Sequence, residues 1–113
     1  MTTIKIFKKN NKLTGLKVTG HTGFGEYGQD ILCASISSIV QTAGLGLRNL
    51  VSQKISMEIN PNIPSFEIKL PSDLLTQQYL QAELILNTCI LGLEDLQSGY
   101  PKNIKLEVKN DVY

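Results

Sequence analysis

The sequence predicts an α+β fold, in which a single small domain of order ββαββαβ packs two helices on a mostly antiparallel sheet. Five short segments alternate apolar and polar side chains, which is the pattern of a half-buried strand. Two longer segments repeat apolar side chains at helical spacing. The length of 113 residues favours one domain, expected to span residues 1–113, with room for two helices on one sheet.

The first two strands are predicted at residues 4–8 and 16–20, where apolar and polar side chains alternate. Asn10 and Asn11 lie between them, and asparagine is typical of a tight turn. The two strands are therefore expected to form a hairpin, with Gly15 as a candidate β-bulge.

A loop and the first helix are expected next. Residues 20–28 hold four glycines and two aromatic residues, a composition that favours a loop. Asp30 then precedes an apolar run of helical spacing, and we expect it to be the N-cap because its carboxylate can accept from the first backbone N–H groups. The apolar run consists of Leu32, Ile36, Ile39, Ala43, Leu47 and Leu50.

Three more strands are predicted from the same alternation. Residues 55–59 and 66–70 form the third and fourth strands, and the segment with Pro61 and Pro64 separates them. Residues 104–108 form the last strand. With the two helices, these strands complete the predicted order.

The second helix is predicted over residues 73–97, with Ser72 as its N-cap and Gly99 and Pro101 after its last turns. Its apolar residues occupy more than one side, although a helix lying on a sheet needs only one apolar stripe. Either a two-fold homodimer interface or deep burial in the monomer explains the surplus. One stripe holds Leu75, Tyr79, Ala82, Leu86, Cys89 and Leu93, and the other holds Leu74, Leu84, Ile85 and Leu91.

Charge and hydropathy narrow the class of partner. With 11 basic and 10 acidic residues and no basic stripe, direct binding to nucleic acid or to an anionic membrane is not expected. The apolar stretch at residues 84–96 is too short and too polar to span a bilayer, and residues 1–10 do not look like a secretory signal. We therefore expect a cytoplasmic protein with reduced thiols.

The residues best suited to chemistry lie between the second strand and the first helix. His21, the only histidine, follows the strand, and Cys33 falls in the first helical turn if Asp30 is the cap. Helix N-terminal N–H groups and a nearby imidazolium lower a cysteine pKa from about 8.5 to roughly 3.5–7.5, which yields the reactive thiolate. The same N–H groups can face a developing oxyanion. Cys33 is thus a candidate nucleophile and His21 its general base.

Each of these residues also has a plainer interpretation. A lone histidine is more often a surface or hydrogen-bonded residue than a catalyst, and Cys89, on a mostly apolar helix, is expected to be packed inside. Asp30 is either only a helix cap or a group that holds the loop or orients His21. Ser37, one turn after Cys33, either forms a hydrogen bond near the site or is a small packing residue.

The segment from Gly23 to Gly28 matches the pattern G-x-G-x-x-G and leaves a nucleotide-binding protein as one alternative. This signal is weak because dinucleotide sites follow a buried parallel strand, whereas the strand before this segment alternates like a hairpin partner. One histidine and two cysteines are too few for a zinc site, so neither a metal nor another cofactor is expected.

Several short motifs together point to a family. They are Gly20-His21, Gly23-Phe24, Glu26-Tyr27-Gly28, Asp30-Ile31-Leu32-Cys33-Ala34 and Ser37, with Leu91-Gly92-Leu93-Glu94 and Tyr100-Pro101-Lys102 towards the C-terminal end. This set resembles the bacterial ribosomal-processing cysteine proteases, and the resemblance covers nearly the whole chain. Thr22 and Gly25 depart from the pattern, because family members often have alanine there.

The resemblance implies a small α/β fold, a homodimer, and a cysteine protease domain in which Cys33 is the nucleophile and His21 the general base. It also implies the substrate, a protein of the large ribosomal subunit from which a short N-terminal extension is removed. Phe24 and Tyr27 then either contact apolar substrate residues or anchor the loop. A non-enzymatic ribosome-associated interaction module is the other alternative, and the reactivity of Cys33 separates the two.

Overall fold

The computed structural model describes residues 1–20, 27–60 and 65–111, and for residues 27–30 it describes the backbone alone. The elements in chain order are β1 (Thr2–Lys9), β2 (Lys12–Thr19), α1 (Tyr27–Gly46), the π-helical turn η1 (Leu47–Val51), β3 (Ser56–Asn60), β4 (Ser65–Lys69), α2 (Thr76–Gly99) and β5 (Ile104–Asn110). This confirms the predicted order ββαββαβ; the end of the predicted first helical run, around Leu47 and Leu50, forms the π-helical turn η1.

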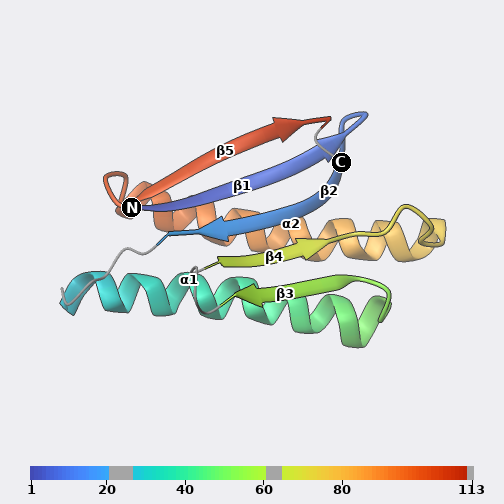
Figure 1. Ribbon diagram of the computed structural model, residues 1–113, viewed down its shortest axis with the longest axis horizontal. Helices are drawn as coiled ribbons and strands as arrows, with labels where there is room; N and C mark the ends of the chain where they lie inside the picture. Colours follow the sequence, from blue (N-terminus) through green and yellow to red (C-terminus); the bar gives the residue numbers. More distant parts are fainter. Residues whose placement is uncertain (21–26, 61–64, 112–113) are drawn as a thin grey trace.

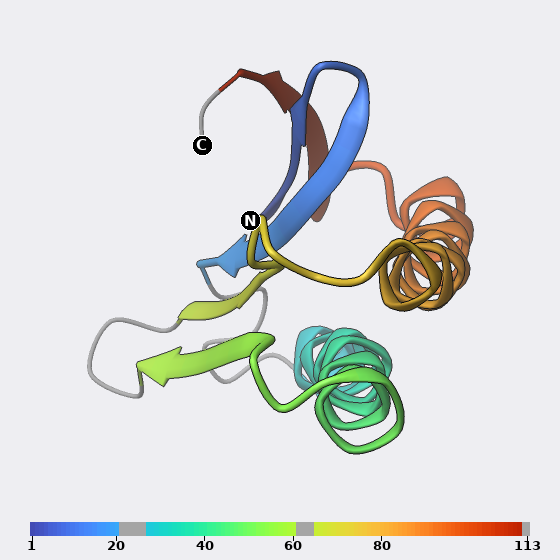
Figure 2. The ribbon, with the colours of Figure 1, turned by 90° about the vertical axis from the view of Figure 1, so that its right-hand side faces the viewer.

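The described strands form one five-stranded sheet in the order β3-β4-β2-β1-β5. Neighbouring strands are antiparallel except for β1 and β5, which are parallel. Both helices lie on the same face of the sheet, α1 beside the β3–β4 half and α2 beside the β1–β5 half (Figures 1 and 2). The predicted fold class, two helices on a mostly antiparallel sheet, is therefore confirmed.

The first hairpin has the turn and the bulge that its residues predict. Asn10 and Asn11 have φ values of 51° and 65°, the positive values that a two-residue hairpin turn of type I′ requires. The register shifts between Phe7, which pairs with Gly15, and Lys8, which pairs with Leu13. The extra residue of the bulge is therefore the one before Gly15, and a bulge of this kind bends the strand and increases its local twist.

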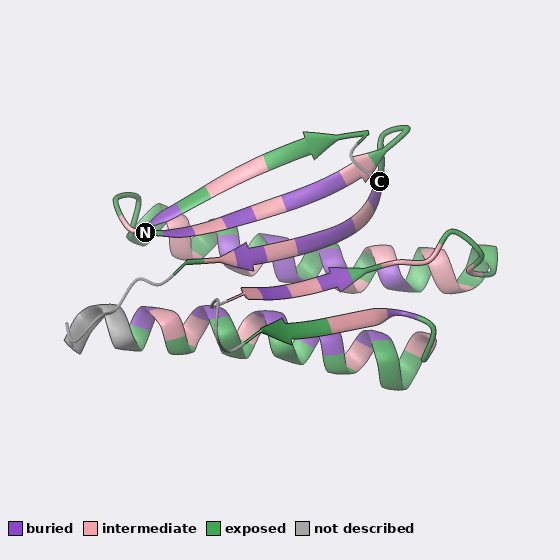
Figure 3. Cartoon of the chain, in the orientation of Figure 1, coloured by how far each residue is buried: buried purple, intermediate pink, exposed green. Residues whose placement is uncertain are grey.

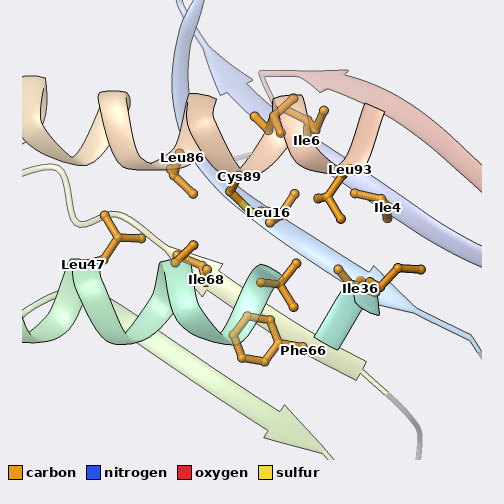
Figure 4. Packing of buried hydrophobic residues seen from close by; sticks show 14 of the residues in the cluster. Ile4, Ile6, Leu16, Ile36, Leu47, Phe66, Ile68, Leu86, Cys89 and Leu93 are labelled. Carbon is orange, nitrogen blue, oxygen red and sulfur yellow. The ribbon is translucent and has the colours of Figure 1, made fainter. Parts of the chain in front are cut away.

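The core lies between the sheet and the two helices. Buried side chains alternate along much of β1, β2 and β4, and each helix buries one stripe (Figure 3). Burial of one large aliphatic side chain stabilises the fold by about 1.5–3 kcal/mol. The side chains that meet in the core include Ile4, Ile6, Leu16, Phe66 and Ile68 from the sheet, Ile36 from α1, Leu47 from η1, and Leu86, Cys89 and Leu93 from α2 (Figure 4).

The start of each helix differs from the prediction. α1 begins at Tyr27, so Asp30 lies inside the helix and is not its N-cap. α2 begins at Thr76 and is not capped by Ser72; the N–H of its N-cap, Leu75, donates to the Oε1 of Gln78 at 3.1 Å.

The segment between β4 and α2 is not helical. The Leu70 N–H donates to the Thr14 carbonyl at 2.9 Å, and Ser72 and Asp73 then lie in a turn before the helix begins. The C-terminal end also differs, because α2 continues through Gly99, two residues beyond the predicted end at Gln97, and Pro101 then follows in a turn.

One described segment, Ile31–Val51, is long and apolar enough to cross a membrane by length and composition alone, with a mean hydropathy of 1.3. In this fold it is a helix of the core. Its side chains Leu32, Ile36, Val40 and Leu47 are at most 3% exposed, and Ile36 and Leu47 are seen among the buried cluster in Figure 4. A helix that packs a sheet on one side and a second helix on another has this apolar composition without any lipid contact.

Candidate active site

A groove with a volume of about 230 Å³ lies at one end of the molecule. Several strand ends gather here, above the first half of α1 (Figure 1). They are the start of β1, the ends of β2 and β3, and the start of β4. The lining residues are Thr2, Val18, Gly20, Ile59, Asn60, Ser65 and Phe66 from or beside the strands, and Cys33, Ile36, Ser37, Val40 and Gln41 from α1.

α1 presents Cys33 and Ser37 to this groove. Cys33, Ser37 and Gln41 are four residues apart, so their side chains follow one another along one helix face. Ile36 and Val40, each 2% exposed, lie on the adjoining face and pack against the sheet, which fixes the rotation of the helix. Cys33 is half-buried in the groove wall. The structure thus brings together two of the predicted site residues, Cys33 and Ser37.

The position of Cys33 within α1 differs from the prediction. Because α1 begins at Tyr27, Cys33 is in the second turn, and its own N–H group falls within the hydrogen-bond ladder of the helix. The effect of a helix N-terminus on a charge falls off within the first turn. The expectation that Cys33 lies in the first helical turn is therefore wrong.

Four predicted site residues lie partly or wholly outside the described part of the structure. His21 and Phe24 lie outside it, and for Tyr27 and Asp30 only the backbone is described, in the first turn of α1. The roles predicted for these side chains stay predictions. His21 directly follows Gly20 in the sequence, and Gly20 lines the groove.

The described groove wall carries no charged side chain. Its surface combines apolar groups with neutral hydroxyl and amide groups, the latter from Thr2, Ser37, Gln41, Asn60 and Ser65. A mostly apolar cleft with a few polar groups in fixed positions is typical of a binding site for an uncharged ligand, or for an uncharged part of a larger ligand. A peptide with apolar side chains fits this surface better than a phosphate does.

Sequence reasoning missed the strand residues that line this groove. Ile59 and Phe66 pair across the β3–β4 hairpin and were correctly placed on strands, but their position beside the groove depends on the sheet order. Alternation of side chains tells which face of a strand is buried and not which strand is its neighbour. For Thr2 a signal did exist, because it shares a strand face with Ile4 and Ile6 and is nonetheless polar.

The second cysteine, Cys89, lies in the core and not at the groove. Its side chain is 4% exposed and lies between α2 and the sheet (Figure 4), and burial raises its pKa to about 11. The thiol is therefore neutral near pH 7 and acts as an apolar packing group, as predicted. No disulfide joins Cys89 to Cys33.

The described residues give little support to a nucleotide site. The strand before the glycine segment, β2, is antiparallel to both β1 and β4, whereas a dinucleotide site follows a parallel strand. Within residues 1–20, 27–60 and 65–111, no group of three or more His, Cys, Asp or Glu side chains is placed to hold a metal ion. The absence of a cofactor stays a prediction.

Comparison with known proteins identifies relatives that match most of the chain. A family model described as Cysteine protease Prp matches residues 1–105. The chain is 30% identical over 98 residues to the ribosomal processing cysteine protease Prp of Staphylococcus aureus, covering 87% of this chain and 89% of that protein. It is 31% identical over 106 residues to the protein of the same name from Mycoplasma pneumoniae, covering 92% of this chain and 93% of that protein.

Solved structures share the fold. The crystal structure of an essential ribosomal processing protease Prp from S. aureus in complex with a substrate peptide has a TM-score of 0.82 and 27% identity. A second structure of the S. aureus protease, with a covalently linked product peptide, has a TM-score of 0.80 and 29% identity. Each match covers 96% of this chain and 100% of that chain, so the likeness extends over both layers.

Proposed function

The chain belongs to the cysteine protease Prp family and is therefore a cysteine protease, and from this premise we propose that Cys33 is its nucleophile and His21 its general base. One observation carries the assignment of the nucleophile. Cys33 is half-buried in the wall of the groove at the strand ends, whereas Cys89, which lies at the base of a second groove between the helices, is only 4% exposed and has a pKa raised by burial to about 11. A thiol that attacks a peptide must be reachable by the peptide.

The pairing with His21 is supported by chain connectivity. Consecutive Cα atoms are about 3.8 Å apart across a trans peptide bond. Gly20 lines the groove, and His21 is the next residue in the sequence. Since Cys33 lies beyond the first turn of α1, an adjacent imidazole is the proposed source of its activation.

The proposed reaction is an acyl transfer through the sulfur of Cys33. His21 takes the thiol proton, and the thiolate attacks the scissile carbonyl carbon to form a tetrahedral intermediate. The intermediate collapses as the C–N bond breaks, and His21 returns the proton to the leaving amine. Water, deprotonated by His21, then attacks the thioester, so that the carboxylic acid leaves and the Cys33 thiol is restored.

Other groups are proposed to support this pair. Ser37 lies one helical turn after Cys33 in the same groove, so its hydroxyl is proposed to form a hydrogen bond near the reacting atoms. Asp30 is proposed to orient His21 or to hold the segment before α1. Phe24 and Tyr27 are proposed to contact apolar residues of the substrate, a role that suits the apolar lining of the groove.

The proposed substrate is the N-terminal extension of a protein of the large ribosomal subunit. The relatives are named ribosomal processing proteases, and one of them has been solved with a substrate peptide. The uncharged side chains of the described groove wall and the net charge of +1 favour a protein substrate over direct contact with nucleic acid. The cytoplasm is the proposed location, since thiols stay reduced there and ribosomes are assembled there.

The protein is also proposed to be a homodimer through the outer side of its helices. An apolar groove of about 740 Å³, which we call the helix groove, lies there and is lined by residues that include Ile39, Leu50, Leu84 and Ile85. Leu50 and Leu84 are 80% and 69% exposed. Contiguous exposed apolar surface of this kind is typical of an interface, and a second copy of the chain covers it most simply.

The experiment that tests the catalytic assignment uses a large-subunit ribosomal protein that carries its N-terminal extension. Wild type is expected to cleave it, and Cys33→Ala and His21→Ala are each expected to lose more than about 10²-fold in rate, because nucleophile and base act as a unit. Gel analysis with mass spectrometry of the products measures the rate and locates the cut.

The control is Cys89→Ser, which changes the other cysteine. It is expected to keep its activity per folded molecule, because Cys89 is not among the residues that line the Cys33 groove. Cleavage by Cys33→Ala at the wild-type rate would end the proposal. Loss of activity in folded Cys89→Ser would reverse the assignment of the two thiols.

A further inference from the structure

Thr2, at the start of β1, is a groove residue with an unexplained hydroxyl. It lines the Cys33 groove and is 2% exposed. Among the described residues, its Oγ1 and that of Thr14 are the buried side-chain oxygen atoms with no hydrogen-bond partner. An unpaired buried hydroxyl costs folding free energy, and native proteins contain few such groups, so this one requires a physical reason.

The main chain of Thr2 is held firmly. Its N–H donates to the Asn103 carbonyl at 2.9 Å, and it pairs with Ile104 in the parallel ladder of β1 and β5. On the other side, a Cβ on Gly20 would lie 2.6 Å from the carbonyl oxygen of Met1, so the two strand ends approach closely. Only the side chain of Thr2 is left to adjust. Rotation about its side-chain torsion χ1 exchanges the positions of the hydroxyl and methyl groups. The hydroxyl can thereby turn towards a group on a bound ligand.

Packing alone does not explain a threonine at this position. Thr2 shares its strand face with the apolar core residues Ile4 and Ile6. Valine has nearly the same shape, is equally suited to a strand and has no polar atom to desolvate. A residue chosen for stability would therefore be valine, and the hydroxyl is instead explained if a bound ligand pairs with it.

We propose that the Thr2 hydroxyl is a substrate-binding group, which forms a hydrogen bond with a main-chain amide group of the peptide in the Cys33 groove. The inference rests on the proposed function, in which this groove holds the peptide that Cys33 cleaves. A peptide carries an N–H and a carbonyl at almost every residue, and a hydroxyl can pair with either because it both donates and accepts. Beside apolar neighbours such as Val18 and Phe66, that amide group would otherwise stay unpaired.

Two substitutions separate the hydroxyl from the shape of the side chain. Thr2→Val removes the hydroxyl and keeps the branched shape, whereas Thr2→Ser keeps the hydroxyl and removes the methyl. Each is combined with Cys33→Ala, so that binding is measured without cleavage. The ligand is a synthetic peptide that copies the substrate extension across the cut, titrated by calorimetry or fluorescence anisotropy.

Thr2→Val is expected to weaken peptide binding by about 5- to 50-fold, and Thr2→Ser by less than about threefold. Only Thr2→Val leaves an amide group of the bound peptide without its hydrogen-bond partner. In proteins that retain Cys33, Thr2→Val is expected to raise KM by the same factor and to leave kcat nearly unchanged. This is the result expected for a contact that is equally strong in the ground state and in the transition state. Equal peptide affinity in Thr2→Val and wild type would overturn the inference.

A stability measurement distinguishes this role from a structural one. Thr2→Val is expected to raise the midpoint of thermal unfolding by a few degrees, because it removes an unpaired buried hydroxyl. Peptide affinity and stability therefore move in opposite directions. A Thr2→Val protein that loses both would show a structural role and overturn the inference.

Failure of this inference is separable from failure of the proposed function. Cleavage by Cys33→Ala at the wild-type rate removes the catalytic assignment, and the Thr2 inference falls with it. An inactive Cys33→Ala that binds the peptide equally well with Thr2 and with valine at this position removes the role of Thr2 alone.

Discussion

Cys33 and Cys89 lie on different helices and meet different surroundings. Cys33 is half-buried in the wall of a groove with hydroxyl and amide groups nearby, whereas Cys89 is 4% exposed between α2 and the sheet. A thiolate is disfavoured where the surroundings are apolar, and burial accordingly raises the pKa of Cys89 to about 11. The same side chain is therefore a candidate nucleophile at one position and a packing group at the other.

The raised pKa of Cys89 predicts a pH-dependent stability. In the unfolded chain this thiol ionises near its ordinary pKa of 9.0, and in the folded protein it stays neutral up to about 11. Between these values the unfolded state binds fewer protons than the native state, so the free energy of unfolding falls as the pH rises. Wild type is expected to lose about 2–3 kcal/mol more than Cys89→Ala over this range.

Urea unfolding of both proteins at the two ends of this range measures the difference. Titration of lysines and tyrosines affects both proteins alike and cancels in the comparison. The cavity that Cys89→Ala leaves lowers its stability at every pH, so only the change with pH is informative. Parallel stability curves would contradict the assigned pKa.

At the scale of an element, Gly44 and Gly46 of α1 have different surroundings within the same helix. A Cβ on Gly44 would overlap the sulfur of Met57 and lie 3.3 Å from the ring of Phe66, whereas a Cβ on Gly46 would meet nothing within 4 Å. Gly44 therefore permits the close approach of α1 to β3 and β4. This approach holds the helix that carries Cys33 against the strands that line the other side of the groove.

Gly44→Val is expected to destabilise the protein by about 1–3 kcal/mol, because the added methyl groups overpack the contact between helix and sheet. Gly99→Val is the control, with the same chemical change at the end of α2, where a Cβ would meet nothing within 4 Å and which does not line the helix groove. Its effect is expected to stay within about 0.5 kcal/mol. Denaturant unfolding of the three proteins measures both values, and equal effects at the two positions would refute the close approach at Gly44.

The elements themselves could be predicted from the sequence, whereas their starts and their arrangement could not. Alternation located all five strands because it records burial of one strand face. Asp30 and Ser72 are good capping residues, yet α1 and α2 begin elsewhere, since a cap forms only where the local backbone permits it. Boundaries thus depend on contacts that periodicity does not record.

The candidate site was predictable to the same extent. The spacing of four residues on one helix placed Cys33 and Ser37 on one face, and both line the groove. Ile59 and Phe66 reach the groove only because β4 pairs with β2, a choice of neighbour that strand alternation leaves open. The residues that share a helix face can be read from positions close in the sequence, whereas the order of strands in a sheet depends on pairing between distant segments.

At the scale of the whole molecule, the two layers present surfaces of opposite character. The outer face of the sheet is charged, and Glu107 there forms ion pairs with Lys105 at 2.8 Å and with Lys109 at 3.4 Å. The outer side of the helices instead carries the helix groove with its exposed leucines. Burial of apolar surface favours association, whereas burial of charges costs desolvation, so a second copy is expected at the helices and not at the sheet.

Leu84 and Leu75 provide a matched test of this dimer, because both side chains are 69% exposed and only Leu84 lines the helix groove. Wild type is expected to have the mass of two chains by sedimentation equilibrium or light scattering. Leu84→Glu is expected to have the mass of one chain, since an interface there would bury an unpaired carboxylate. Leu75→Glu, at the N-cap of α2, is expected to remain dimeric.

The groove that carries Cys33 and the helix groove share α1 but none of their lining residues. Two outcomes would contradict the dimer: a wild-type protein with the mass of one chain at micromolar concentration, or a dimeric Leu84→Glu. If Leu84→Glu is monomeric and still cleaves its substrate, each chain carries a complete site and the interface serves stability alone. If it is folded but inactive, association instead holds α1 in the position that Cys33 requires, and the two grooves are coupled through that helix.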